Sequence, residues 1–385
     1  MPNRKTIFLV LVFCGLFGLA KSSLAVPSIS GFSGTVVNES SITISGSGFQ
    51  SKATAKPLLW ADFAEGNTNP SSLGQITSWD IAESPVLDSS PSIDCHSSHC
   101  MTSGSQFWYS NGGNGMAMGI NPAGLVGTYG QQMYINFWRR IDSHYASEIQ
   151  TSQGPNVKWL RIWGNDTNPP HGYPDTYTSQ VQCDGGNPIY TEMAGSWEVW
   201  PGSWILPTTT WKNEEYIYKY NSAVGQANGV FDIQMNQIME STSTNWQSDS
   251  SSYPLTGQGD IDIQDEFSPE TCGSDSSYMP QSPDAVWYDG IYIDDTWQRV
   301  MICDSSTWAS RTHCEIQIPS AWSDNGTAAS ITATANQGSF PDGSTAYLYV
   351  VDSTNTTNAS GYPIAFGSFG SGTAVPNSPT GLSVE

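Results

Sequence analysis

The stretch EEYIYKYNSAVGQANGVFDIQMN (214–236) contains the two kinds of segment that alternate along this sequence. Residues 215–220 carry tyrosine at every second position, and residues 229–236 alternate apolar with polar side chains. Successive side chains of a β-strand point to opposite faces, so both runs are predicted to be strands. Gly, Asn and Ser fill the residues between them, as is typical of turns. The stretch therefore predicts two strands joined by a turn-rich connection.

The same alternation of short β-rich runs with turn-rich ones extends over the chain, and helical periodicity is almost absent. This pattern is typical of a β-sandwich or β-barrel. Further strands are predicted at 58–63, 133–141, 157–163 and 290–295, and 239–259 is predicted to be a long polar loop.

The N-terminus has the three parts of a secretory signal. Arg4 and Lys5 form a basic start, residues 7–20 are an apolar run, and residues 23–25 offer a small-residue cleavage site. We expect the mature chain to begin near Val26 and to be secreted. Since the apolar run is shorter than a membrane span, no membrane insertion is predicted.

The charge of the chain argues against nucleic acid and anionic lipid as partners. The 385 residues include 13 basic and 35 acidic ones, a net charge of −22. Cleavage of the signal removes three basic residues, which leaves 10 against 35 and a net charge of −25. Such a surface repels nucleic acid and disfavours a strongly anionic substrate, unless a local basic patch overrides it.

Six cysteines lie beyond the signal, and an even number predicts disulfides in an exported chain. Short loops favour two bridges and leave a third, so we predict Cys95–Cys100, Cys303–Cys314 and Cys183–Cys272. The alternative for CHSSHC (95–100) is a zinc cluster, because cysteine and histidine both bind zinc. Its ligands are crowded into one tight loop, so the disulfide is preferred.

The two ends of the mature chain resemble the two halves of an IPT/TIG domain, a small immunoglobulin-like sandwich. The resemblance lies in the alternation and turn of residues 26–50 and in the β-rich run of residues 330–367. Neither piece has enough strands to enclose a core. We therefore predict one split module, in which Ile42 and Ile44 pack against some of Ile331, Tyr347, Tyr349 and Val351. The alternative is two separate decorations.

Residues 57–302 resemble the concanavalin A-like lectin and glucanase jelly rolls, in particular the heparin-lyase-like and alginate-lyase-like branch. The resemblance lies in WADFAEG (60–66), INFWRR (135–140), VKWLRIW (157–163), the stretch 214–236 and WYDGIYIDDTWQRV (287–300). It implies that the first and last strands lie together, as insertion into another domain requires. The fold serves lectins, hydrolases, lyases and structural modules alike.

The predicted architecture is thus all-β, a concanavalin A-like jelly-roll sandwich inserted in a small immunoglobulin-like sandwich. The predicted divisions are a signal (1–25), the first part of the split module (26–56), the jelly roll (57–302), the second part of the split module (303–367) and a tail (368–385).

A strip of aromatic and polar residues on the predicted strands is our candidate sugar-binding surface. Aromatic rings stack on the apolar faces of sugars, and polar side chains match their hydroxyl groups. The alternative is that half of the rings fill the space between two sheets. The candidate residues are Trp159, Arg161, Trp163, Tyr216, Tyr218, Tyr220, Asp232, Gln234 and Asn236.

The acidic stretch DIDIQDEF (260–267) resembles the E-x-D-x-x-E strand of laminarinase-type glucanases. The outer acids of that strand act as nucleophile and general acid, which must lie close together. Here Asp260 stands for the first Glu, Asp262 for the middle Asp, and Asp265 or Glu266 for the last Glu. Because the first acid is shortened and the spacing is irregular, hydrolysis is not the preferred function.

A polysaccharide lyase needs a cation or amide to neutralise a uronate, and a Tyr, His or Lys to take its proton. The R-x-E-x-R and Q-x-H patterns of lyases are absent from the sequence. The available groups are Arg139, Arg140, His144, Lys158, Arg161, Tyr218 and Lys219. Together with the acidic stretch, the catalytic candidates become Arg161, Tyr218, Lys219, Asp260, Asp262 and Glu266.

A structural calcium ion is expected where the first and last strands of the jelly roll meet, and no organic cofactor is expected. Asp62 and Glu65 lie on the first strand, Asp294 and Asp295 lie on the last, and carboxylates suit Ca²⁺. The alternative is a solvated acidic edge that protects a strand from aggregation.

These observations favour an exported protein that recognises polysaccharide without turnover, because every catalytic pattern is incomplete. The alternatives are a lyase acting by β-elimination, then a glycoside hydrolase, then a structural module of a cell surface or matrix.

Overall fold

The computed structural model is almost entirely β, with one short 3-10 helix, η3 (Trp308–Ser310), among its described residues. In that part of the chain, no helix has the length and hydropathy needed to span a membrane. The described residues are 25–83, 86–88, 95–96, 99–102, 117–122, 124–142, 156–165, 172–180, 189–193, 196–199, 210–268 and 285–367. The predicted signal and tail therefore lie outside them.

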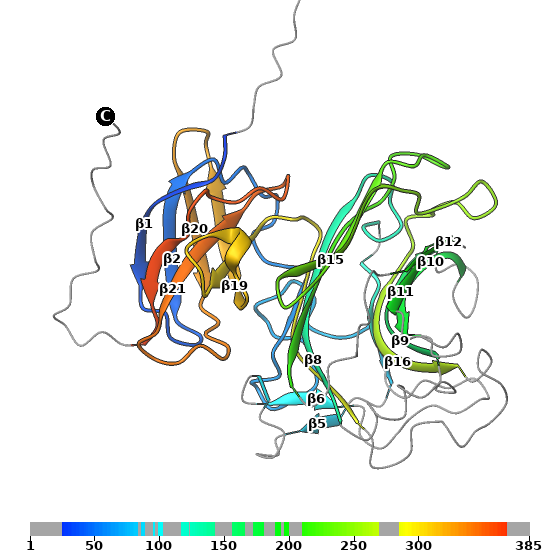
Figure 1. Cartoon of the computed structure of the whole chain (residues 1–385), viewed down its shortest axis with the longest axis horizontal. Helices are drawn as coiled ribbons and strands as arrows, with labels where there is room; N and C mark the ends of the chain where they lie inside the picture. The colour runs from blue at the N-terminus through cyan, green and yellow to red at the C-terminus, as the bar shows by residue number, and fades with distance from the viewer. Residues whose placement is uncertain are drawn as a thin grey trace, which may run out of the picture.

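Two antiparallel sheets form a jelly-roll-like sandwich from the middle of the chain (Figure 1). The seven-stranded sheet has the order β12-β11-β10-β9-β16-β7-β4. Its strands are β4 (Ile81–Glu83), β7 (Ala117–Ile120), β9 (Asn156–Asn165), β10 (Gly172–Gln180), β11 (Ile189–Met193), β12 (Ser196–Val199) and β16 (Ile261–Ser268).

The eight-stranded sheet has the order β15-β14-β13-β8-β17-β6-β5, and β3 also pairs with β17. Its strands are β3 (Leu59–Ala61), β5 (Val86–Asp88), β6 (Cys100–Thr102), β8 (Gln132–Ile141), β13 (Lys212–Lys219), β14 (Gly229–Met235), β15 (Ile238–Trp246) and β17 (Val286–Asp294). All six strands expected from the sequence are present in the two sheets. The loop expected at 239–259 is wrong in its first part, where β15 pairs with β14.

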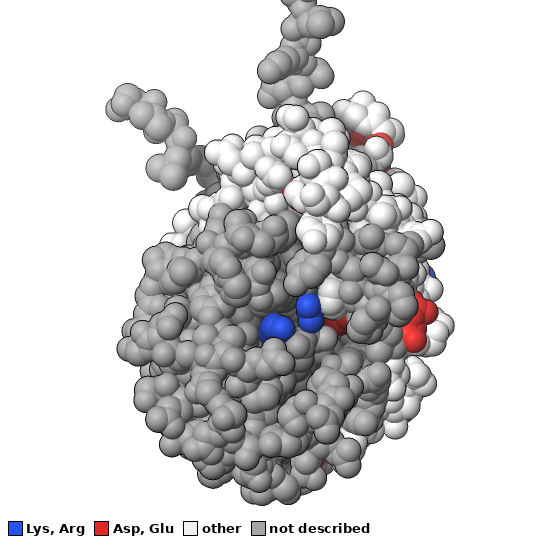
Figure 2. Space-filling model, turned by 90° about the vertical axis from the view of Figure 1, so that its right-hand side faces the viewer, with Lys and Arg blue, Asp and Glu red and all other residues white. Residues whose placement is uncertain are grey.

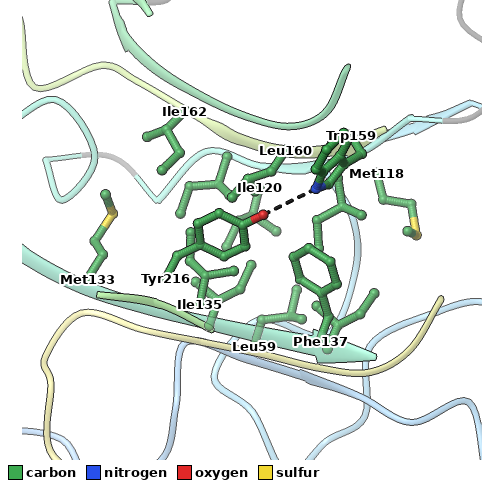
Figure 3. Packing of buried hydrophobic residues seen from close by; sticks show 14 of the residues in the cluster. Leu59, Met118, Ile120, Met133, Ile135, Phe137, Trp159, Leu160, Ile162 and Tyr216 are labelled. Atoms are coloured by element: carbon green, nitrogen blue, oxygen red, sulfur yellow. Dashed lines mark hydrogen bonds between the residues drawn. The ribbon is translucent and has the colours of Figure 1, made fainter. Parts of the chain in front are cut away.

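Apolar side chains from both sheets fill the sandwich (Figure 3). Leu160 and Ile162 of β9 face Ile135 and Phe137 of β8, and all four are almost completely buried. Burial of such side chains is the main favourable term in folding. Tyr216 joins this core, because alternation along β13 sends it inward and sends its neighbours to the outer face.

The third sheet unites the two ends of the chain in the order β1-β2-β20-β19-β18-β21-β22. The predicted pairing between the ends is confirmed, because Ile44 of β2 lies opposite Ile331 of β20. The strands are β1 (Ser28–Gly34), β2 (Ser41–Ser47), β18 (Arg299–Cys303), β19 (Cys314–Asp324), β20 (Ala329–Thr334), β21 (Thr345–Val351) and β22 (Tyr362–Ala365). We call this sheet the terminal module.

The terminal module folds around its own core. The first half of β19 pairs with β18 and its second half with β20, with a register shift between the halves. Ile42, Ile44 and Ile331 pack there with Leu348 and Val350. On β21 the residues that face this core are Leu348 and Val350, whereas the sequence analysis expected their neighbours. Tyr349, one of the expected residues, packs in a separate cluster with Cys303 and Cys314.

The boundary predicted at residue 302 also moves. β18 falls within the predicted jelly roll (57–302), yet it pairs with β19 and β21 of the terminal module. The chain therefore leaves the sandwich after β17, through the short connection 295–298.

The terminal module packs on the outer face of the eight-stranded sheet. Tyr134, Ile217 and Tyr292 of that sheet form one buried cluster with Ile316 and Ile318 of β19. In Figure 1 the terminal module lies beside β15 and β8, on the side away from β9 and β16. One sheet of the jelly roll is therefore covered on both faces.

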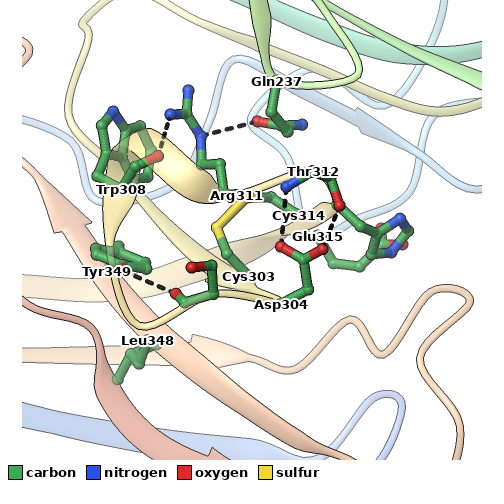
Figure 4. Close-up of a disulfide and its surroundings, with 12 residues drawn as sticks. Gln237, Cys303, Asp304, Trp308, Arg311, Thr312, Cys314, Glu315, Leu348 and Tyr349 are labelled. Atoms are coloured by element: carbon green, nitrogen blue, oxygen red, sulfur yellow. Dashed lines mark hydrogen bonds and ion pairs between the residues drawn. A yellow bond between two sulfur atoms is a disulfide. The ribbon is translucent and has the colours of Figure 1, made fainter.

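Two of the predicted disulfides are present, Cys95–Cys100 and Cys303–Cys314. The second joins neighbouring strands (Figure 4), where Asp304 accepts hydrogen bonds from the backbone and hydroxyl of Thr312 at 3.0 and 2.5 Å. In the same view, Arg311 reaches across to Gln237 of the eight-stranded sheet. The third predicted pair, Cys183 and Cys272, lies outside the described residues.

Candidate functional site

The outer face of β9 and β16 brings predicted site residues together in the middle of the seven-stranded sheet. Asp262 lies directly opposite Arg161, and Ile263 lies opposite Leu160. Because the isoleucine and the leucine point into the core, alternation places Asp262, Arg161 and Trp163 on the outer face.

Trp163 is the fixed centre of this group. Its Nε1 donates a hydrogen bond of 2.7 Å to Asp262 Oδ2, and the guanidinium carbon of Arg161 lies 3.8 Å from the centre of its ring. Trp163 and Asp262 are buried, whereas Arg161 is half-buried. The indole therefore supports a cation that solvent reaches, by a cation–π contact.

Lys158 and Gln264 extend the group along the same two strands, and Asp260 directly precedes β16. Lys158 is half-buried, while Asp260 and Gln264 are 2% and 4% exposed. The close approach of the strands depends on Gly259, where a β-carbon would lie 1.9 Å from the carbonyl oxygen of Trp163. The accessible groups of this face are therefore the cations, and the carboxylates lie beneath them.

Figure 2 looks onto the side of the molecule where Figure 1 places β9, β10 and β16. Basic side chains lie at the floor of a hollow in this side, next to an acidic one. The chain has only 13 basic against 35 acidic residues, so accessible cations close to one another are a distinctive feature of the described part of this face.

The expected aromatic strip is wrong in four of its rings. Trp159, Tyr216, Tyr218 and Tyr220 lie in the core between the sheets, each at most 1% exposed. A register shift between β9 and β10 makes Trp159 an extra residue that turns inward beside Leu160. The tyrosines were placed correctly on one face of β13, but that face is the inner one.

The polar candidates of β14 lie on the other sheet and are occupied by other contacts. Gln234 Oε1 accepts a hydrogen bond of 2.7 Å from Arg311 of the terminal module. Asp232 accepts one from Thr242, and the side chain of Asn236 accepts one from the backbone of Asn213. They form no site with Arg161, because they belong to the covered sheet.

The candidate bases and acids are likewise divided. Lys219 and Tyr218 lie on β13, in the eight-stranded sheet, so they do not join Arg161. Asp262 lies on the outer face of β16 and Asp260 directly precedes that strand, and a register shift between Ile263 and Glu266 breaks the alternation that the glucanase pattern needs. The side chains of Asp265 and Glu266, and all of His144, lie outside the described residues.

One buried network escaped the sequence analysis. Glu214 accepts hydrogen bonds from Arg139, Trp159 and Tyr216 at 2.7–2.9 Å inside the sandwich. Burial and the neighbouring Glu214 raise the pKa of Tyr216 well above its usual value. The sequence did contain a sign of this buried glutamate. Residues 214 and 215 are both glutamate, and one of two neighbours in a strand must point inward.

The four acids expected to bind calcium do not come together. The pairing of β3 with β17 is confirmed, but it is antiparallel, with Ala61 opposite Ile291 and Leu59 opposite Ile293. Asp62 and Asp294 therefore lie at opposite ends of the pair, roughly 13 Å apart at about 3.3 Å per residue. Among the described residues, no group of three or more His, Cys, Asp or Glu side chains is arranged to hold a metal ion.

Neither a protein-family model nor a curated protein sequence matches this chain. Among solved structures, it is similar to an endo-β-1,4-glucuronan lyase from the fungus Trichoderma reesei, with 13% identity, 57% of this chain and 92% of that chain covered, and a TM-score of 0.39. Alginate lyase Aly36B shows 14% identity, coverage of 62% and 98%, and a TM-score of 0.37. The binding domain of botulinum neurotoxin serotype G shows 10% identity, coverage of 76% and 72%, and a TM-score of 0.38. Likenesses this distant assign no ligand or reaction to the chain.

Proposed function

We propose that the outer face of β9 and β16 binds polysaccharide, and that Lys158 and Arg161 contact acidic groups of the sugar. The observation that carries this proposal is the guanidinium of Arg161 over the ring of Trp163, whose indole nitrogen is held by Asp262. A guanidinium offers donors in a rigid fork that matches a carboxylate or sulfate. Trp163 acts as a positioning residue for Arg161.

The charge of the whole chain also shapes this proposal. An excess of acidic residues repels an anionic polymer everywhere except where cations face solvent. Binding of an acidic polysaccharide would therefore be confined to the hollow over β9 and β16. The two disulfides support the proposal that the protein works outside the cell, and the paired chain ends support a split IPT/TIG-like module.

Electrophoresis through gels that contain alginate, polyglucuronate or a neutral glucan tests the proposal. We expect an acidic polysaccharide to retard the protein, and Arg161→Gln to weaken binding roughly 10-fold or more, the usual effect of losing a charged hydrogen bond. The matched control is Lys219→Gln, which removes a half-buried cation from the covered sheet. Equal retardation of wild type and Arg161→Gln, or none by any polysaccharide, would contradict the proposal.

A lyase at the same face is the second candidate. Lys158 is a residue type that can take a proton from a sugar, and Arg161 can neutralise the uronate whose proton is taken. The two lie on one strand, β9, of the seven-stranded sheet. Incubation with the same polysaccharides separates the two functions: unsaturated uronate products that disappear in Lys158→Gln indicate a lyase, and binding without products indicates a carbohydrate-binding protein.

A further inference from the structure

Lys52 and Asp294 meet where the two modules join. Lys52 lies on the connection from β2 of the terminal module to β3 of the jelly roll, and Asp294 is the last residue of β17. Although 242 positions separate them, Lys52 Nζ lies 2.5 Å from Asp294 Oδ2. Both side chains are buried, at 1% and 0% exposure.

The surroundings of this pair hold both groups in place. Lys52 Nζ also donates a hydrogen bond of 3.2 Å to the carbonyl of Ala55 and lies 5.5 Å from the ring centre of Trp322. Tyr292 donates its hydroxyl to the same carboxylate oxygen, Asp294 Oδ2, at 2.8 Å. The amine is therefore fixed against a carboxyl group that already has a second donor.

Burial also favours the neutral form of the Asp294 carboxyl group. It raises the pKa of Asp294 to about 7, although Lys52 opposes this shift, and the neighbouring Asp295 adds to it. An ammonium–carboxylate pair and an amine–carboxylic acid pair differ by the position of one proton, and a buried site disfavours the charged pair. An amine beside a carboxylic acid is the reactant pair for amide formation.

We propose that Lys52 and Asp294 condense to an amide, which joins the two side chains covalently. The bond from Lys52 Nζ to Asp294 Cγ forms and the bond from Cγ to Oδ2 breaks. Oδ2 leaves as water with the acid proton and one proton from Nζ, so no oxidant, reductant or further reactant is needed. Tyr292 is placed to pass protons to the leaving oxygen, since its hydroxyl already contacts Oδ2.

The cross-link would close a ring around the inserted sandwich. Its two ends lie at the entrance to β3 and the exit from β17, so the ring contains every strand of the jelly roll. A covalent bond at the base of so long a loop restricts the unfolded chain, as a disulfide does. Unlike a disulfide, an amide persists under reducing conditions.

Mass spectrometry of the reduced full-length mature protein tests this inference. We expect an intact mass lower by one water than the sequence requires, no tryptic cleavage after Lys52, and a peptide in which the segments around Lys52 and Asp294 are joined. The full sequence mass, together with a free tryptic peptide that ends at Lys52, would overturn the inference. A water loss located elsewhere, such as a succinimide at Asp289-Gly290, would also overturn it.

Variants locate the reaction. Lys56→Arg is the matched control, because Lys56 lies nearby but donates to the carbonyl of Ser72, and it should keep the mass deficit. Lys52→Arg and Asp294→Ala should restore the full mass, and Tyr292→Phe should leave a larger fraction of chains uncondensed. If Asp294→Ala fails to fold, the mass of the wild-type protein and the presence or absence of the linked peptide still test whether the amide forms.

Discussion

The two outer faces of the jelly roll carry similar residues, but one is covered by the terminal module and the other is accessible to solvent. On the eight-stranded sheet, Glu215 accepts the hydroxyl of Tyr134 at 2.5 Å and lies 3.9 Å from Arg299 of the terminal module, which covers both. On the seven-stranded sheet, Arg161 lies over Trp163 and is half-exposed. Charge and aromatic rings on the outside of a sheet therefore do not define a binding face. A face must also remain reachable by a ligand.

The covered face also shows why its charges are costly to disturb. Removing one member of a buried ion pair leaves the other charge without compensation in a medium that solvates it poorly. On the reachable face this constraint does not apply to Lys158 and Arg161, because both are half-buried and water can solvate them. Replacing a cation should therefore destabilise the covered sheet more than the reachable one.

The largest effect should come from deleting residues 26–50, which removes β1 and β2. The deletion exposes the apolar core around Ile331 and Val350, so residues 330–367 should become sensitive to protease. Limited proteolysis with mass analysis of the fragments measures this. Unchanged protection of 330–367 would show that the terminal module does not need its N-terminal half.

A smaller loss of stability should follow from Glu215→Gln on the covered face. The substitution leaves Arg299 fully buried without its carboxylate, which typically costs about 3–5 kcal/mol. Urea unfolding gives the difference, and Glu65→Gln at an exposed position is the control, within about 0.5 kcal/mol of wild type. A similar loss in both variants would contradict the distinction between covered and reachable charges.

The covered face should also respond to acid through Glu315 of the terminal module. Burial alone would raise the pKa of Glu315, but His96 and His313, at 2.8 and 2.9 Å, lower it to about 2. A carboxylate whose pKa is lower in the folded protein stabilises it above the unfolded value and loses that contribution as the pH falls. Stability should therefore decline between the usual glutamate range and pH of about 2. Urea midpoints across this range should fall less steeply for Glu315→Gln than for wild type.

The smallest change in stability should come from Trp163→Phe on the reachable face. Phenylalanine keeps most of the packing but cannot donate to Asp262, so about 1–3 kcal/mol of stability should be lost. Polysaccharide binding should weaken severalfold, because Arg161 loses part of its support. Titration of the folded variant against the preferred polysaccharide measures this. Intact affinity would show that Trp163 does not position Arg161.

Much of the local structure could be predicted from the sequence. The run 215–220 predicted a strand with three tyrosines on one face, and Tyr216, Tyr218 and Tyr220 do pack together in one core. What could not be predicted is which side faces the other sheet, because tyrosine suits both a sugar and a core. The inward orientation of Trp159 was missed for a different reason. It is an extra residue at a bulge in β9, and the alternation of the sequence does not reveal a bulge.

Long-range partners were predictable where a segment had only one apolar face. Ile42 and Ile44 alternate with polar residues, so their packing with Ile331 followed from the pattern. In β21 every residue from Ala346 to Val351 is apolar or aromatic, so the sequence could not distinguish its two faces. For the candidate site, the sequence identified Arg161, Trp163, Asp260 and Asp262 but not the separation of Lys219 from them, which depends on the order of strands in two sheets.

The pairing of β2 with β20 has a consequence for how the chain is made. Synthesis delivers β2 early, but the strand beside it arrives only after the whole inserted sandwich has been translated. Until then Ile42 and Ile44 have no core to enter, and pairing over such a distance is slow. The early strands must wait without aggregating, and the frequent Ser and Gly of residues 28–48 suit that delay. A strand that is translated after the whole inserted sandwich therefore completes the sheet that β2 begins.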